Sequence, residues 1–290
     1  MTVKHNKYTI HKADEWLKRQ IELFFITEFP ENILLSHGIE HHRRVWNYAV
    51  ELINAGYVNT NNLNELFIDN LLMACYFHDI GMAENQDKNH GLTSRKKCLE
   101  FIAKFNLNAD NFAEALNAIE FHDDKTYSAA KTTNNVLAVL SVADDLDAFG
   151  FIGIYRYADI YLRRGLKKTE LGKKVMDNAK RRFDNFINDK NTNSALLKKH
   201  ISRYNILNIF FEAYNNSIEH YISINAIPNG YCGVIDIIYS LINSADENDL
   251  SNVFSAYSND SIISWFTEGI SEELKRLSFS SDSSIINIKS

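Results

Sequence analysis

The feature that most constrains the fold of this chain is how rarely its sequence interrupts a helix. Among 290 residues there are only two prolines, Pro30 and Pro228, and eleven glycines. A fold built from many short strands needs turns, and turns are rich in these two residue types. Their scarcity therefore favours long helices over a turn-dense β fold.

Apolar residues also recur at helical spacing in nearly every segment. One example is the segment 37–55, in which Val45, Tyr48, Ala49 and Leu52 share a face. We therefore predict an all-α protein. The predicted helices cover residues 13–27, 37–55, 63–79, 93–105, 109–122, 136–148, 152–164, 169–188, 196–222, 231–244 and 256–277. The Ser-rich tail after them is compatible with a loose segment or with a short strand.

The composition changes near residue 165, where glycines and lysines cluster. We take this change as the boundary between a helical core of catalytic type, residues 1–165, and a helical extension, residues 166–290. The extension either completes the same domain or forms a region for specificity or oligomer contacts, so a homo-oligomer is one expectation. No internal repeat is visible.

Bulk composition narrows the class of protein. A net charge of −6 argues against a general nucleic-acid binder, although it leaves room for a local basic pocket. No run of about 18 uncharged apolar residues is present, so we expect no membrane span. The N-terminal residues do not resemble a secretory signal. Three cysteines in apolar surroundings suggest reduced thiols, and we expect a cytoplasmic protein.

Two histidine–aspartate pairs stand at the ends of apolar helices. His78 and Asp79 end the predicted helix 63–79, and His122, which is followed by Asp123, ends the predicted helix 109–122. Neighbours within a helix point about 100° apart, but at a frayed last turn both side chains can face one cavity. Such a pair alone carries little information, because it occurs twice in this chain.

Other histidines and aspartates lie on the apolar faces or at the start of predicted helices. His41 shares a stripe with Val45, and Asp144 shares one with Leu140. An inward carboxylate is costly unless it is paired or bound to a cation. His90 opens a further helix. Separate helices therefore present His or Asp side chains at their ends or on their buried faces.

In order, His41, His78-Asp79, His90, His122 and Asp144 resemble the HD superfamily of metal-dependent phosphohydrolases. The matching pieces are HHRRV, FHDIG, a histidine at a helix start, IEFHDD and ADDLDAFGFIGIYR, and they cover about residues 36–160. The resemblance implies an HD-domain helical bundle. It also implies that one ion is held by His41, His78, Asp79 and Asp144. In two-metal members, Asp79 would bridge to a second ion bound by His90 and His122.

Mixed histidine and carboxylate ligands suit one or two ions of Mn, Fe, Co, Ni or Zn, with Mg as a further option. Around these ligands we expect supporting residues. Asp147, one turn after Asp144, is a candidate to orient a ligand, as are His37 and Arg44. Asp145 is a rival to Asp144 that points about a third of a turn away. Candidates for phosphate contact are Arg95, Lys125 and Arg156. The basic segment 163–182 either extends an anionic substrate groove or is a solvated helix face.

The expected reaction is hydrolysis of a phosphate ester or anhydride by metal-activated water, with Asp79 and Asp144 as catalytic residues. The resemblance points to a small phosphorylated substrate of the nucleotide type. Alternatives are an HD-type di-iron oxygenase, a nuclease, and a non-catalytic module that senses a nucleotide. The acidic net charge counts against nucleic acid as a partner, and the basic segment counts for it.

Overall fold

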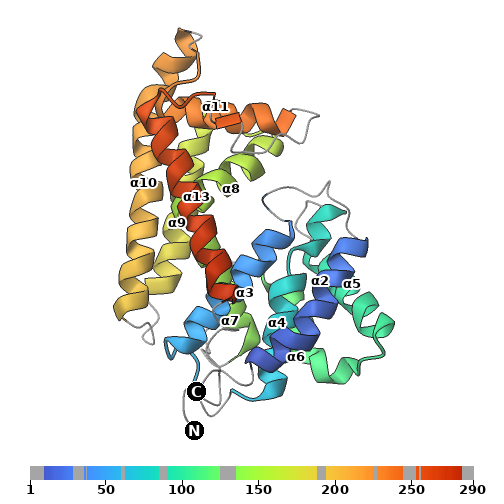
Figure 1. The fold of residues 1–290 in the computed structure, drawn as a ribbon. Helices are drawn as coiled ribbons and strands as arrows, with labels where there is room; N and C mark the ends of the chain where they lie inside the picture. Colours follow the sequence, from blue (N-terminus) through green and yellow to red (C-terminus); the bar gives the residue numbers. More distant parts are fainter. Residues whose placement is uncertain are drawn as a thin grey trace. The chain divides into compact units, whose positions relative to one another are not determined.

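The computed structural model of the chain describes residues 10–28, 36, 38–59, 63–84, 90–124, 135–187, 194–224, 227–243, 253–254 and 256–282. Every regular element in these ranges is helical, which confirms the predicted all-α class (Figure 1). The predicted helix ends agree with the observed ones to within a few residues, apart from the last helix. That helix begins at Ser261 and continues to Asp282, so the first part of the Ser-rich tail is helical.

The chain divides into two compact units. The first comprises Met1–Asp147 with Asn185–Leu196, and the second comprises Ala148–Asp184 with Leu197–Ser290. The predicted boundary at residue 165 falls inside the second unit, at the turn between two of its helices. The division into a catalytic core and an extension, which is a statement about function, stays a prediction.

Among the described residues of the first unit, one short helical element precedes the first long helix, and two more lie between later ones. Its central helix is α4, which packs against α3, α5, α6 and α7 (Figure 1). The elements are η1 (Asp14–Lys18), α2 (Arg19–Glu28), α3 (Ile39–Asn54), α4 (Glu65–Phe77), η3 (Ile80–Ala83), α5 (His90–Lys104), η4 (Ala109–Phe112), α6 (Ala113–Phe121) and α7 (Val136–Asp147).

Sequence explains why α4 lies at the centre of this unit. Its residues Leu71 to Phe77 are all apolar, and all of them are buried. A helix that is hydrophobic all round gains most when every side is covered by other helices. Asn64 caps its N-terminus by accepting from the backbone N–H of Phe67 at 2.8 Å. The residues that follow its C-terminus are therefore held deep inside the unit.

In the second unit, α8 (Gly150–Arg163), α11 (Gly230–Asn243) and α13 (Ser261–Asp282) pack on one another. Glu273 of α13 accepts from the backbone N–H of Ile152 at 3.0 Å and from Arg203 at 3.2 Å. This carboxylate thus neutralises the positive N-terminal end of α8 and also ties α13 to α10. The helices α9 (Lys168–Ile187) and α10 (Ser194–Ser223) complete the unit, apart from the end of α9 and the start of α10.

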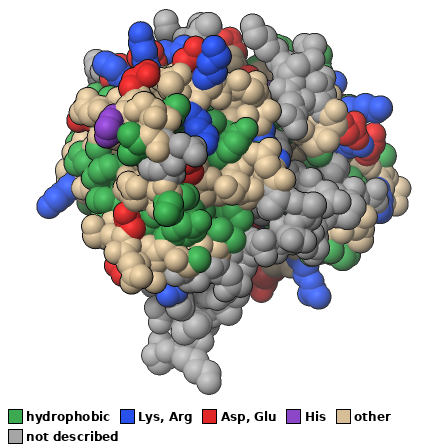
Figure 2. All heavy atoms as spheres, turned by 90° about the horizontal axis from the view of Figure 1, so that it is seen from above, with side chains coloured by type: hydrophobic (Ala, Val, Ile, Leu, Met, Phe, Trp, Pro, Cys, Tyr) green, Lys and Arg blue, Asp and Glu red, His purple; other side chains and the backbone are tan. Residues whose placement is uncertain are grey.

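On the face drawn in Figure 2, hydrophobic, basic and acidic side chains are intermingled. Within the described residues, no helix combines the length and the apolar character needed to cross a membrane.

Candidate metal centre

Buried histidines and aspartates from five helices meet inside the first unit. One group unites His41 of α3, Asp144 of α7, and the pair His78 and Asp79 that follows α4. A second group unites Asp79 with His90 of α5 and with His122, which follows α6. In each group the ligand atoms lie within 4.8 Å of one another. Asp79 is common to both groups.

The same local device orients two of these histidines. His78 and His122 are the C-cap residues of α4 and α6. The Nδ1–H of His78 donates to the carbonyl of Cys75 at 3.0 Å, and that of His122 donates to the carbonyl of Ile119 at 2.7 Å. Each imidazole thus bonds a carbonyl that the end of its helix would otherwise leave without a helical partner. Because a carbonyl can only accept, Nδ1 of each ring carries a proton, and Nε2 faces the cluster.

His41 is oriented by a carboxylate instead. Its Nδ1 donates to Oδ2 of Asp147 at 2.8 Å, and Asp147 also accepts two hydrogen bonds from Arg44, at 2.8 and 3.1 Å. All three side chains are buried. Although burial alone would lower the pKa of Arg44, Asp147 raises it, so the guanidinium stays charged. A carboxylate that fixes a histidine ring in this way is a common second partner of metal-bound imidazoles.

The Nε2 atoms of His41 and His78 then face each other at 3.2 Å. Burial lowers the pKa of His78 to about 3, so this ring is neutral near pH 7. The neutral ring of His78 donates through Nδ1 and so directs the lone pair of Nε2 toward Nε2 of His41, an arrangement that a cation between the two nitrogens would stabilise. Metal–nitrogen bonds of about 2.0–2.1 Å place neighbouring nitrogens about 3.0–3.4 Å apart. The observed spacing fits two ligands of one ion, and the donor set fits a divalent transition metal.

Asp79 offers one oxygen to each group. Its Oδ2 lies 3.5 Å from Nε2 of His41 and 3.6 Å from Nε2 of His78. Its Oδ1 lies 2.9 Å from Nε2 of His122 and 3.3 Å from Nε2 of His90. Burial would raise the pKa of Asp79, but His78 and hydrogen bonds from the other imidazoles lower it well below its usual value. The group is therefore a carboxylate, and its two oxygens can bridge two ions.

Asp144 completes the first group at a longer distance. Its Oδ1 lies 3.9 Å from Nε2 of both His41 and His78. The whole of α7, including Asp144, Asp145 and Asp147, is buried. The three carboxylates diverge: Asp144 points to the histidines, Asp147 to His41 and Arg44, and Asp145 accepts from Asn185 at 3.2 Å.

Two glycines allow α5 to approach closely enough for His90 to reach Asp79. A Cβ on Gly81 would lie 2.3 Å from the carbonyl oxygen of His90, and the backbone N–H of Gly81 donates to Ser94 at 2.8 Å. A Cβ on Gly91 would lie 2.5 Å from the carbonyl oxygen of Glu120. Any side chain at these positions would push α5 away from η3 or from α6.

Several predicted residues lie elsewhere or cannot be placed. Asp123, the carboxylate of the second histidine–aspartate pair, is exposed. Arg95 forms an ion pair with Glu120 at 3.3 Å, and Arg156 is buried on α8 in the second unit. Their proposed role in phosphate contact stays a prediction. His37 and Lys125 lie outside the described residues.

One buried residue at the centre was not among the expected site residues. His42 packs its ring against those of His41 and His78, with centroids 5.2 Å away from each. Its Nδ1 donates to the same Cys75 carbonyl that orients His78, at 3.3 Å. Burial lowers its pKa well below the usual value, so the ring is neutral. The adjacent histidines at 41 and 42 both point inward because α3 packs on both α4 and α7.

A helical unit with these buried histidines and aspartates is an HD domain. The profile of the HD-CE family matches residues 9–203, about two thirds of the chain, and the chain belongs to this family. The matched region begins before the residues of both candidate metal groups and ends within α10. Comparison with curated proteins finds no match, and neither does comparison with solved structures.

Proposed function

We propose that this protein is a metal-dependent phosphohydrolase that acts on a nucleotide or a related phosphate ester or anhydride. The observation that carries the proposal is the position of Asp79 between two sets of histidines, with Oδ2 toward His41 and His78 and Oδ1 toward His90 and His122. A carboxylate that faces two ligand sets in this way suits a pair of ions about 3.5–4 Å apart, the spacing typical of two-metal phosphoesterases.

The side chains of the candidate centre would have different roles in the reaction. Bound ions would lower the pKa of coordinated water to about 7 and would neutralise charge on phosphoryl oxygens. His41, His78 and Asp144 would hold one ion, His90 and His122 the other, and Asp79 both. Asp144 lies farther from the histidines of its group than Asp79 does, with its Oδ1 3.9 Å from Nε2 of both His41 and His78. It is therefore the candidate to accept a proton from the attacking water. Asp147 and Arg44 would keep His41 in the required tautomer.

The nature of the ligands supports hydrolysis over phosphate binding alone. The candidate ligand atoms of both groups come from imidazoles and carboxylates. Arg44 is held by Asp147, and Arg95 is paired with Glu120. An anionic substrate at this site would therefore be bound mainly through the metal ions, which also activate the water.

The test combines metal analysis of the purified protein with a phosphate-release screen across nucleotides in the presence of Mn, Co, Ni or Mg. We expect metal to copurify and at least one nucleotide to be hydrolysed. Asp79→Asn should lose both metal and activity. Asp123→Asn is the matched control, because it makes the same change at the exposed aspartate of the second histidine–aspartate pair.

Three results would contradict the proposal. Oxygen uptake with iron and no phosphate release would favour a di-iron oxygenase. Calorimetric binding of a nucleotide without turnover, with metal present, would favour a sensor. Full metal content and full activity in both Asp79→Asn and His78→Ala would show that the chemistry lies elsewhere.

A further inference from the structure

Positive charge is concentrated in one short stretch of the second unit. Residues 163–182, which run from the end of α8 through most of α9, contain nine lysines and arginines but only two acidic residues, Glu170 and Asp177. This is a net charge of +7 in a chain whose total is −6. Such segregation creates a local positive potential that the bulk composition conceals.

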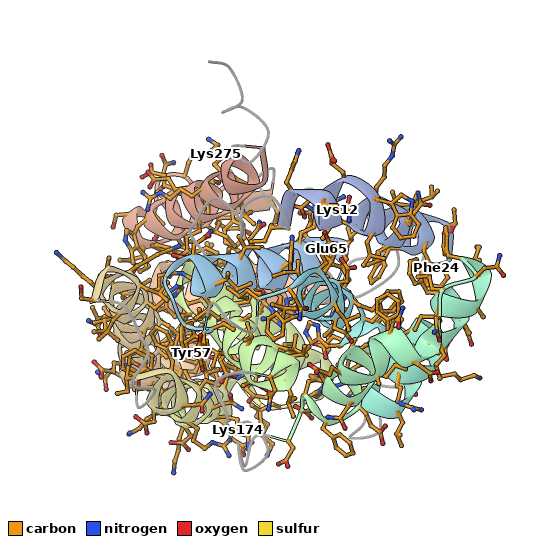
Figure 3. The ribbon with its side chains drawn as sticks, turned by 90° about the horizontal axis from the view of Figure 1, so that it is seen from below. Lys12, Phe24, Tyr57, Glu65, Lys174 and Lys275 are labelled. Carbon is orange, nitrogen blue, oxygen red and sulfur yellow. The ribbon has the colours of Figure 1, made fainter. Side chains whose placement is uncertain are left out.

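Internal ion pairs neutralise only part of this charge. Arg163 pairs with Asp159, Lys168 with Asp236, and Lys180 with Asp184. Five other cations are exposed and have no ion pair within the described residues. These are Arg164, Lys167, Lys173, Lys174 and Arg181. Figure 3 shows Lys174 projecting outward from α9.

Arg164 and Arg181 lie near an aromatic and amide cluster that joins α8 to α9. Tyr157 of α8 donates to Oδ1 of Asn178 of α9 at 3.0 Å, and Arg182 donates to the same oxygen at 3.1 Å. Tyr161 stacks on Tyr157 with ring centroids 5.7 Å apart. Burial raises the pKa of Tyr161, while the nearby Arg182, Arg164 and Arg181 act against this shift. The three arginines thus lie near one phenol.

We propose that the exposed cations of α8 and α9 form a binding surface for the phosphate backbone of a nucleic acid. The surface consists of Arg164, Lys167, Lys173, Lys174 and Arg181, and Tyr161 lies near its two arginines. This proposal is independent of the metal centre and goes beyond the proposed hydrolase activity. Lysine and arginine contacts to phosphates supply sequence-independent affinity for nucleic acids.

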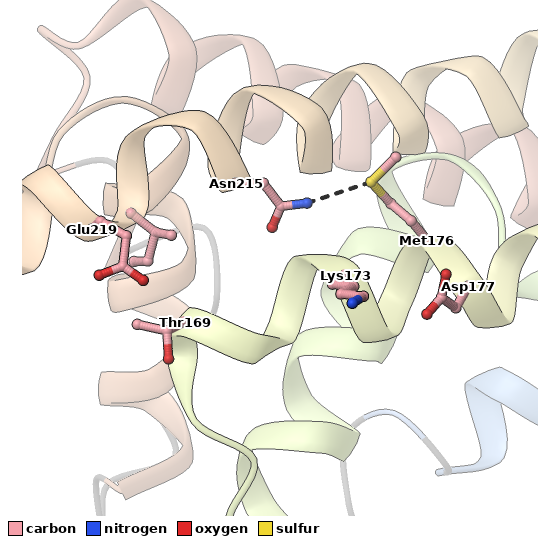
Figure 4. A pocket seen from close by; sticks show the side chains of 7 residues that line it. Thr169, Lys173, Met176, Asp177, Asn215 and Glu219 are labelled. Atoms are coloured by element: carbon pink, nitrogen blue, oxygen red, sulfur yellow. Dashed lines mark hydrogen bonds between the residues drawn. The ribbon is translucent and has the colours of Figure 1, made fainter.

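The arrangement of the cations favours a linear polyanion. Lys167, Lys174 and Arg181 follow one another at seven-residue intervals, which is about 10 Å of helix per step. A single phosphate group can contact one or two of them, whereas a strand can contact all. Lys173 faces a neighbouring groove of about 440 Å³ between α9 and α10, where Asp177 and Glu219 bring negative charge (Figure 4). The groove therefore bounds the surface on that side.

The test is fluorescence anisotropy of the full-length protein with labelled single-stranded RNA and DNA of mixed sequence. EDTA is present throughout, so that cleavage cannot interfere and the result does not depend on the metal centre. If all five cations contact phosphates, the logarithm of the binding constant should fall with that of salt concentration with a slope of about −3.5. The triple variant Arg164→Glu, Lys174→Glu, Arg181→Glu should bind at least about tenfold more weakly and should reduce the slope to about −1.4.

The matched control makes the same change in net charge elsewhere. Arg19, Lys96 and Arg276 are exposed cations on α2, α5 and α13, and their triple replacement by glutamate should leave binding close to that of the wild type. Equal losses in both triple variants would mean that only the overall charge matters. Absence of binding at low salt, or binding to vesicles rich in phosphatidylserine without binding to nucleic acid, would overturn the proposal. Circular dichroism confirms that each variant is folded.

Discussion

The carboxylate of Asp147 joins a histidine of the candidate metal centre to a buried arginine. It accepts from Nδ1 of His41 and, through both oxygens, from Arg44. Because all three groups are buried, the charge of Asp147 both stabilises the fold and sets the tautomer of His41.

Asp147→Asn should therefore weaken metal binding and stability together. The buried Arg44 would lose its counter-charge, which costs about 3–5 kcal/mol when a buried pair is broken. Loss of an orienting carboxylate typically lowers metal affinity about 10- to 100-fold. Metal titration and urea unfolding measure the two effects. Asp145→Asn changes a carboxylate on the same helix that accepts from Asn185, so this variant should retain metal affinity. If it loses as much metal affinity as Asp147→Asn, the assignment of the two carboxylates to different faces of α7 is wrong.

Mutation should remove one of the two proposed ions and leave the other bound. His90 and His122 face only Oδ1 of Asp79, so the double variant His90→Ala, His122→Ala should bind one ion per chain where the wild type binds two. Inductively coupled plasma mass spectrometry of the dialysed proteins gives the stoichiometry. His220→Ala, which changes an exposed histidine on α10, serves as the control. A wild-type protein that binds a single ion under saturating Mn would contradict the two-ion arrangement.

Gly81 and Gly91 should be intolerant of alanine for a steric reason. Their added Cβ atoms would meet backbone atoms at 2.3 and 2.5 Å, which no side-chain rotation can relieve. We expect each variant to be destabilised by at least about 1–3 kcal/mol, the typical cost of an overpacked core. Metal binding through His90 should weaken as well. Gly56→Ala is the comparison, because Gly56 has open space around it and only its φ of +82° is unfavourable. Gly56→Ala should lower the free energy of unfolding by about 1–2 kcal/mol, the cost of a left-handed backbone conformation for alanine. It should not change metal affinity.

Acid should destabilise the metal-free protein below about pH 6.5. Burial lowers the pKa of His78 to about 3 and that of His42 well below its usual value. Both rings stay neutral in the folded state, whereas in the unfolded chain they bind protons below their ordinary pKa of about 6.5. The unfolded state then binds more protons, so the free energy of unfolding falls as pH falls, by up to about 1.4 kcal/mol per pH unit for each ring.

Urea unfolding in EDTA between pH 7.5 and roughly 4.5 tests this behaviour within the titration range of histidine. The stability of His42→Phe should depend less steeply on pH, because one of the two titrating rings is removed. A phenylalanine suits this site, because the ring centroid of Phe25 lies 5.1 Å from that of His42. His220→Phe should follow the wild type. A stability that does not change between pH 7 and 5 would contradict the assignment of neutral buried rings.

Sequence periodicity determined the helices and the inward direction of His41 and Asp144, because a repeat near 3.6 residues specifies which side of a helix is apolar. It also placed His78 and His122 at helix ends, since an apolar run stops there. The nature of the bonds that hold these histidines was not visible, because the acceptors are backbone carbonyls, which every residue carries.

Tertiary structure decided that the carboxylate of Asp79, which the family resemblance already indicates as a ligand, lies in the candidate centre, whereas that of Asp123 does not. Asp79 is buried at the end of the central helix α4, whereas Asp123 is exposed after the shorter α6. It also decided that Arg95 pairs with Glu120, and that His42 joins the cluster. The physical reason is that residue spacing sets the direction of a side chain around its own helix, while the identity of its partner depends on how the other helices pack against that face.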